Sequence, residues 1–143
     1  MNVLIINGPN LNLLGERQPT TYGTETLDEI TAWIKDHPKA AGHSLKFKQS
    51  NHEGEIIDII QTNRIWADGI IINPAAFTHY SYAIRDALEA VDKPVVEVHL
   101  SDIKHREDFR KTSVIEPVCL KQIAGKGKQG YLDGLMILIS HPN

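Results

Sequence analysis

The sequence predicts an α/β fold in which one parallel β-sheet carries helices on both faces. Apolar runs that suit strands buried on both sides alternate along the chain with amphipathic runs of helical spacing. Strands of that kind belong to parallel sheets covered by two helix layers. The length of 143 residues suits one domain. We therefore expect a single domain, 1–143, with a flavodoxin-like, doubly wound five-stranded sheet of order 2-1-3-4-5.

The strands are indicated by short apolar or alternating runs. Val3-Leu4-Ile5-Ile6 and Ile70-Ile71-Ile72 are apolar throughout, whereas Leu45 and Phe47 alternate with polar residues. Runs of both kinds are bounded by residues that favour turns. In chain order, strands are predicted at 3–7, 44–50, 69–74, 94–98 and 118–124.

Capping residues and prolines mark the helices between these strands. Thr26 and Glu29 have the spacing of a capping box, and Pro38 ends the helix that they begin. Thr78 is expected to cap the third helix, in which apolar residues recur with helical spacing. In chain order, helices are predicted at 26–37, 53–66, 78–91 and 131–139.

The segment 7–23 after the first strand is unusually long and polar for a connection in an α/β unit, which has typically ~2–6 residues. In a doubly wound sheet, residues that follow the strands meet at the carboxyl edge, where ligands bind. Polar residues that the prediction places at this edge are Asn7, Asn10, Arg17, Tyr22, Ser50, Asn51, His52, Glu53, Asn73, Thr78, His79, Glu97, His99, Ser101, Arg106 and Arg110.

Tyr22 and Arg17 lie on this long loop and form a candidate base. A free phenol ionises near pH ~10, so it needs a strong stabilising partner to act as a base at neutral pH. A guanidinium in a water-poor pocket stabilises the phenolate. From spacing alone, the more common interpretation is a loop tyrosine that only buries its apolar ring, and both interpretations stay open.

Glu97 and His99 form a candidate acid. Positions i and i+2 of a strand face the same side, and a carboxylate beside an imidazole fixes its tautomer and favours its charged form. A structural hydrogen-bonded pair is an equally good reading of these two residues.

His79, Arg106 and Arg110 are candidate ligand contacts. His79 follows Thr78 at a predicted helix start, where backbone N–H groups bind anions. Arg106 and Arg110 share one face if their segment is helical, and both suit a carboxylate or a hydroxyl-rich ligand. A solvated charged face is the plainer reading of either arginine.

Composition excludes several classes of function. The net charge of −3 gives no sign of nucleic-acid binding. No apolar run approaches the ~20 residues of a membrane span, and no leader precedes the first strand, so we expect a cytoplasmic protein. Cys119 is the single cysteine and is read as a small core residue.

No cofactor or metal site is expected either. The glycines of 125–130 match G-x-G-x-x-G literally, but the chain ends 13 residues after Gly130, too early for a dinucleotide site. We read them as a tight turn. The histidines show no zinc-binding spacing. What remains is a phenol, a carboxylate-held imidazole, amides and guanidinium groups. This set suits elimination of water from a small hydroxylated carboxylic acid.

The chain also resembles a known family, the type II 3-dehydroquinate dehydratases, over nearly its whole length and in order. The residues that carry the resemblance are 7–15, Arg17, Pro19, Tyr22-Gly23, 49–55, 73–76, Thr78-His79, Ser81, 97–101, Arg106-Glu107, Phe109-Arg110 and 129–131. It implies a flavodoxin-like fold and conversion of 3-dehydroquinate to 3-dehydroshikimate by trans elimination through an enolate, without metal or Schiff base.

The resemblance also implies a role for each matching residue. Tyr22 would be the base, and Arg17 would stabilise its phenolate. Asn10 would help to stabilise the enolate through a water. His99, oriented by Glu97, would be the acid for the C1 hydroxyl. Asn73 and the backbone of Leu100 and Ser101 would bind the substrate carboxylate, and His79 and Arg110 would bind its ring hydroxyls. Arg106 matches a family arginine without a clear role.

The resemblance further implies an assembly of trimers into a dodecamer, in which Asp86 reaches a neighbouring subunit's site. It leaves open whether the pathway is shikimate and aromatic amino acid biosynthesis or quinate breakdown. Gln18, Tyr80 and Lys104-His105 depart from the family pattern and bear on loop closure and affinity. Two rival hypotheses are a non-catalytic flavodoxin-like module that binds a small anion, and a dehydratase that forms an imine through lysine.

Overall fold

The computed structural model describes residues 1–142 and contains a parallel five-stranded sheet of order β2-β1-β3-β4-β5, as the sequence predicts. Every neighbouring pair of strands is parallel. The strands are β1 (Asn2–Asn7), β2 (Ser44–Gln49), β3 (Gly69–Asn73), β4 (Val95–His99) and β5 (Lys121–Ala124). The helices are α1 (Pro19–Tyr22), α2 (Leu27–Asp36), α3 (Glu53–Thr62), α4 (Tyr82–Val91) and α5 (Gln129–Ser140).

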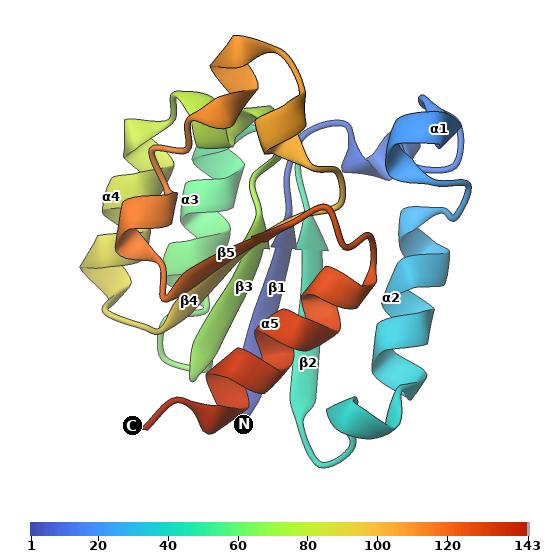
Figure 1. Ribbon diagram of the computed structural model, residues 1–143. Helices are drawn as coiled ribbons and strands as arrows, with labels where there is room; N and C mark the ends of the chain where they lie inside the picture. The colour runs from blue at the N-terminus through green and yellow to red at the C-terminus, as the bar shows by residue number, and fades with distance from the viewer. Residues whose placement is uncertain (143) are drawn as a thin grey trace.

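Two apolar layers hold the helices against the sheet, α2 and α5 on one face and α3 and α4 on the other (Figure 1). Ile5 and Ile71 pack toward Leu135 of α5, whereas Leu4 and Ile70 belong to the layer that includes Ile56 of α3. Successive residues of one strand therefore enter opposite layers, because side chains alternate along a strand. This is why β1, β3 and β4 are buried along almost their whole length.

Local sequence signals explain several helix boundaries. Thr26 accepts a hydrogen bond from the backbone N–H of Glu29, so the predicted capping interaction is confirmed. Gly125 and Gly127 have positive φ angles of 78° and 54°, which confirms the tight turn before α5. Cys119 packs, partly buried, against the layer of α3 and α4.

The prediction that Thr78 caps the third helix is wrong. Thr78 lies inside a 3₁₀ turn, η3 (Ala75–His79), and α4 begins only at Tyr82, where Ser81 accepts a hydrogen bond from the N–H of Ile84. A threonine in the right sequence context was a plausible cap, but its hydroxyl is committed to Glu97 instead. For the same reason His79 does not lie at a helix N-terminus.

Two further boundaries differ from the prediction by three residues or more, and one segment lacks the helix that was considered for it. The helix expected at 53–66 ends at Thr62, and the strand expected from 118 begins at Lys121, because 116–118 form a 3₁₀ turn. The segment with Arg106 and Arg110 is not one helix: two 3₁₀ turns, η4 (Ile103–His105) and η5 (Asp108–Lys111), leave Arg106 between them. Within 1–142, no helix is long and apolar enough to cross a membrane.

Candidate active site

A cleft with an empty volume of about 550 Å³ opens at the carboxyl edge of the sheet. Its walls come from the loop after β1, from η3 after β3, and from the segment after β4, and α1 and this last segment lie over the same end of the sheet (Figure 1). The side chains that line it are mostly polar, as a site for a small hydroxylated ligand requires. They include Asn10, Arg17, Tyr22, Asn73, His79, His99, Leu100, Ser101, Arg106 and Arg110.

The loop after β1 turns directly over the end of β3 at Gly8. Its N–H donates to the carbonyl of Asn73 at 2.7 Å, and a Cβ at this position would lie 2.7 Å from the carbonyl oxygen of Pro74. Only glycine permits this approach. Two residues on, Asn10 has a φ of 68° and its N–H donates to the Asn51 side chain at 3.0 Å. The side chain of Asn10 thus lines the cleft from a fixed turn.

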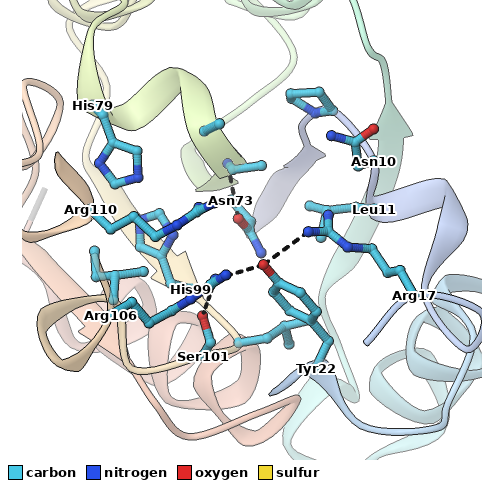
Figure 2. Close-up of a pocket in the computed structure, with 15 residues that line it drawn as sticks. Asn10, Leu11, Arg17, Tyr22, Asn73, His79, His99, Ser101, Arg106 and Arg110 are labelled. Atoms are coloured by element: carbon cyan, nitrogen blue, oxygen red, sulfur yellow. Dashed lines mark hydrogen bonds between the residues drawn. The ribbon is translucent and has the colours of Figure 1, made fainter. Parts of the chain in front are cut away.

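Tyr22 accepts hydrogen bonds from two guanidinium groups, which approach its hydroxyl oxygen from different sides of the cleft (Figure 2). Arg17 Nη2 donates to Tyr22 Oη at 2.9 Å, and Arg106 Nη1 donates at 2.6 Å. The Arg17 guanidinium also lies 4.1 Å from the centre of the tyrosine ring. Two guanidinium groups at one phenol oxygen can stabilise negative charge that develops there. Arg106, which the sequence left without a clear role, is therefore the second partner of Tyr22.

Glu97 and His99 form a hydrogen-bonded pair, as their spacing on β4 predicts. His99 Nε2 lies 2.6 Å from Glu97 Oε1, and Glu97 is completely buried. The hydroxyls of Thr78 and Ser113 also donate to this carboxylate. Burial opposes its charged form, but the hydrogen bonds from His99, Thr78 and Ser113 hold the pKa of Glu97 below its ordinary value.

Asn73 ends β3 with its amide held in one orientation. The N–H of Ala75 donates to Asn73 Oδ1 at 3.1 Å, and Asn73 Nδ2 donates to the hydroxyl of Tyr131 at 3.4 Å. Tyr131 in turn donates to Asn7 Oδ1 at 2.5 Å. Burial raises the pKa of Tyr131 to about 12, so this phenol stays neutral and serves as a structural bridge.

His79 and Arg110 form another wall of the cleft (Figure 2). The ring Nδ1 of His79 lies 2.7 Å from the carbonyl of Thr112, and a carbonyl can only accept, so Nδ1 carries the hydrogen. Burial, with a lesser effect of the nearby His99 and Arg110 charges, lowers the pKa of His79 despite its bond to Thr112. Arg110 Nε donates to Glu107 at 2.7 Å.

The cleft brings together the residues for which the family resemblance implies a role, except Glu97 and Asp86. Glu97 lies behind His99, and Asp86 lies on an exposed part of α4. The side chain of Ser101 accepts a 3.4 Å hydrogen bond from Arg106. Other polar residues predicted at this edge of the sheet do not line the cleft: Asn7, Ser50, Asn51, His52, Glu53 and Thr78.

Four residues support the site through contacts that the sequence did not predict. Thr78 was read as a helix cap, and Ser113, Tyr131 and Asn7 had no assigned partner. Ser113 lies 16 positions from Glu97 along the chain, and Tyr131 lies 124 positions from Asn7. No local spacing reports contacts across such separations, so only the fold could reveal them.

The arrangement places a phenol bound by two guanidinium groups and a carboxylate-held imidazole around one small cleft. The first can remove a proton and the second can deliver one. Asn73 and the donors at the end of β4 can bind an anionic group between them. Among residues 1–142, no group of three or more His, Cys, Asp or Glu side chains is placed to hold a metal ion.

Comparison with known proteins gives consistent results. The family described as dehydroquinase class II matches residues 1–139. A 3-dehydroquinate dehydratase of Roseiflexus castenholzii is 55% identical over 132 residues, which cover 92% of this chain and 84% of that protein. One of Dictyoglomus turgidum is 50% identical and covers 100% of this chain and 99% of that protein. The crystal structure of a type II dehydroquinase from Butyrivibrio crossotus is 48% identical, with a TM-score of 0.95 over 98% of both chains.

Proposed function

The chain belongs to the class II dehydroquinase family, and from this premise we propose that it eliminates water from 3-dehydroquinate with Tyr22 as the base and His99 as the acid. As a 3-dehydroquinate dehydratase it is a hydro-lyase. The observation that carries the proposal is the pairing within one cleft of a tyrosine bound by two arginines and a histidine bound by a buried glutamate.

The first step is removal of a proton from the carbon beside the ketone. The Tyr22 phenolate, stabilised by Arg17 and Arg106, takes this proton. The electron pair of the broken carbon–hydrogen bond remains on the substrate as an enolate. Asn10, at its fixed turn, helps to stabilise the enolate oxygen through a water. Electrostatic stabilisation of such a charge is commonly the largest catalytic term.

The second step is loss of the C1 hydroxyl as water. His99 delivers its proton to the leaving oxygen, the carbon–oxygen bond breaks, and the enolate electrons form the new double bond of 3-dehydroshikimate. Glu97 orients the imidazole and balances its positive charge. The overall elimination is trans, since base and acid act on opposite faces of the ring. The protein returns to its starting state when one proton passes from Tyr22 back to His99 through solvent.

The remaining contacts orient the substrate. Asn73 and the backbone of Leu100 and Ser101 hold its carboxylate, while His79 and Arg110 hold ring hydroxyls. These assignments agree with a neutral imidazole at His79 and with an Asn73 amide whose oxygen is already occupied.

A turnover assay with 3-dehydroquinate tests this function. The conjugated enone product absorbs in the ultraviolet, so we expect a rising signal that depends on protein concentration. No signal from folded protein would contradict the enzyme and favour a module that only binds a small anion. Borohydride added with the substrate should leave the activity intact, whereas an imine-forming dehydratase would be trapped through a lysine.

We further propose that the working form is an oligomer, a dodecamer built from trimers, in which Asp86 of one subunit serves its neighbour's cleft. Its exposed position on α4, outside its own cleft, supports this proposal. Sedimentation at assay concentration tests it: full activity from a monomer would rule it out. We place the enzyme in the cytoplasm, in shikimate synthesis or quinate breakdown.

A further inference from the structure

The hydroxyl of Ser113 contacts the buried carboxylate behind the acid, although Ser113 itself does not line the cleft. Its Oγ lies 3.0 Å from both Oε1 and Oε2 of Glu97. Ser113 belongs to the short segment 112–115 that joins η5 to the next 3₁₀ turn, η6 (Glu116–Val118). No local sequence motif connects this serine with β4.

The direction of this hydrogen bond is fixed by the backbone around Ser113. The N–H groups of Ile115 and Glu116 donate to Ser113 Oγ at 3.1 and 2.9 Å. A hydroxyl has two acceptor lone pairs and a single hydrogen. Both lone pairs are therefore occupied, and the hydrogen of Ser113 has to be donated to a neighbour. Two acceptors lie within reach: the Glu97 carboxylate, 3.0 Å away, and the hydroxyl oxygen of Thr78, 2.7 Å away, which itself donates to Glu97. By either route the hydrogen of Ser113 supports the Glu97 carboxylate.

Thr78 adds a second donor from η3. Its hydroxyl donates to Glu97 Oε1, the oxygen that is also hydrogen-bonded to His99 Nε2. Three donors lie within reach of Oε1 and one, Ser113, lies within reach of Oε2. This arrangement favours an acceptor-only, ionised carboxylate. The hydrogen shared with His99 then belongs to Nε2, which leaves Nδ1 as the nitrogen that exchanges a proton with a ligand.

The segment that carries Ser113 is itself held at both ends. The N–H of Val114 donates to the Thr78 carbonyl at 2.8 Å, and the Thr112 carbonyl accepts from the His79 ring at 2.7 Å. Ser113 sits between these two contacts. Its hydroxyl therefore keeps its place relative to η3 and to β4, and one short segment supports both Glu97 and His79.

We propose that Ser113 is a positioning residue for the acid: a hydroxyl that can only donate, and that holds Glu97 as the acceptor for His99. The inference rests on the proposed function, because it concerns the acid of that reaction. Ser113 acts through Glu97 and does not touch the substrate.

Replacement of Ser113 by alanine gives the sign of the expected effect. The alanine variant lacks a donor that stabilises ionised Glu97, so every state with an ionised Glu97 becomes less stable. The state in which His99 is neutral is destabilised most, because no imidazolium then balances the carboxylate. Both proton-binding steps of the Glu97–His99 pair should therefore move to higher pH, by about half to one unit. The other titratable or charged groups nearby are unchanged in this variant: His79, Arg110, Arg106, Tyr22, Cys119 and Glu116.

The experiment measures these steps in two ways, by the pH profile of turnover and by NMR titration of ¹³C-labelled histidine, with the His99 signal assigned by His99→Gln. In Ser113→Ala we expect turnover about tenfold lower and an alkaline limb displaced upward. Ser113→Thr keeps the hydroxyl and should restore both. Thr78→Val removes the other donor and should move the proton-binding steps of the Glu97–His99 pair in the same direction. This variant provides a second measurement if Ser113→Ala folds poorly.

Ser81→Ala is the matched control. Ser81 also accepts from a backbone N–H, that of Ile84 at 3.1 Å, and donates to a carboxylate, that of Glu53 at 2.7 Å, but it does not contact Glu97. It should leave the profile and the titration unmoved. Unchanged titration of the pair in both Ser113→Ala and Thr78→Val would overturn the proposal. Absence of turnover in the unmodified protein would instead contradict the proposed function, while the titration would still report the hydrogen bond.

Discussion

The two sides of the cleft are built differently. On the acid side, Glu97 is fully buried and is held by side chains from three separate segments, at β4, η3 and 112–115. On the base side, Tyr22 ends α1, a four-residue helix without a single buried residue. Its hydroxyl is joined to the body of the protein through Arg106, while Arg17 belongs to its own loop.

The difference indicates a division of labour between fold and loop. The proposed acid needs one fixed tautomer, and buried hydrogen bonds between segments of the core supply it. The proposed base needs a positive environment and access to the substrate, and a loop at the edge of the cleft supplies both. Changes on the acid side should therefore disturb protonation and stability together, whereas changes on the base side should disturb turnover alone.

Removal of the base should have the largest effect. Tyr22→Phe keeps the ring and loses the oxygen that takes the proton, so we expect kcat to fall by about 10³-fold or more. Substrate affinity should change by only a few fold, because the other contacts remain. Rapid-quench turnover and equilibrium binding measure the two quantities separately. Equal loss of both would mean that Tyr22 serves chiefly to bind.

The carboxylate behind the acid comes next. Glu97→Gln removes the charge that balances the His99 imidazolium, and its amide must turn a donor toward Thr78, Ser113 or His99. We expect kcat to fall by about 10²-fold, together with a lower melting temperature. Glu89→Gln, at an exposed carboxylate of α4 that does not line the cleft, is a control with the same chemical change. Normal turnover in Glu97→Gln would refute the role of Glu97.

A smaller effect is expected from Arg106→Gln. One of the two guanidinium groups at the Tyr22 oxygen is lost, so kcat should fall by about tenfold. Arg106→Lys keeps the charge and should recover part of the rate. Thermal stability should hardly change, in contrast to Glu97→Gln. Unchanged kcat in Arg106→Gln would show that Arg17 alone supports Tyr22.

The smallest expected effect concerns stability at low pH. The native pKa of Glu97 lies below its ordinary value of 4.5, so between these two values the unfolded chain binds more protons than the folded one. The free energy of unfolding should fall as the pH drops below about 4.5 and through the native pKa. Chemical denaturation at several pH values should show that Glu97→Gln loses this component and Tyr22→Phe retains it.

The sequence predicted the sheet, its strand order and most of the site, because these follow from periodicity and from what leaves the strand ends. Glu97 and His99 share a strand, so their contact could be read from a two-residue spacing. Thr78 could not be placed in the same way: its local context suits a helix cap, and the competing contact to Glu97 exists only in three dimensions. Arg106 similarly lies 84 positions from Tyr22, beyond any local pattern.

The close approach at Gly8 has a consequence for the size of the cleft. Gly8 does not line the cleft, yet the lack of a side chain there brings the loop that carries Tyr22 within hydrogen-bonding distance of the strand that ends in Asn73. A methyl group at this position would force the two apart, since its carbon would meet the Pro74 carbonyl at 2.7 Å. The span between the floor of the cleft and its loop is thus limited by a backbone contact, at a residue that does not itself line the cleft.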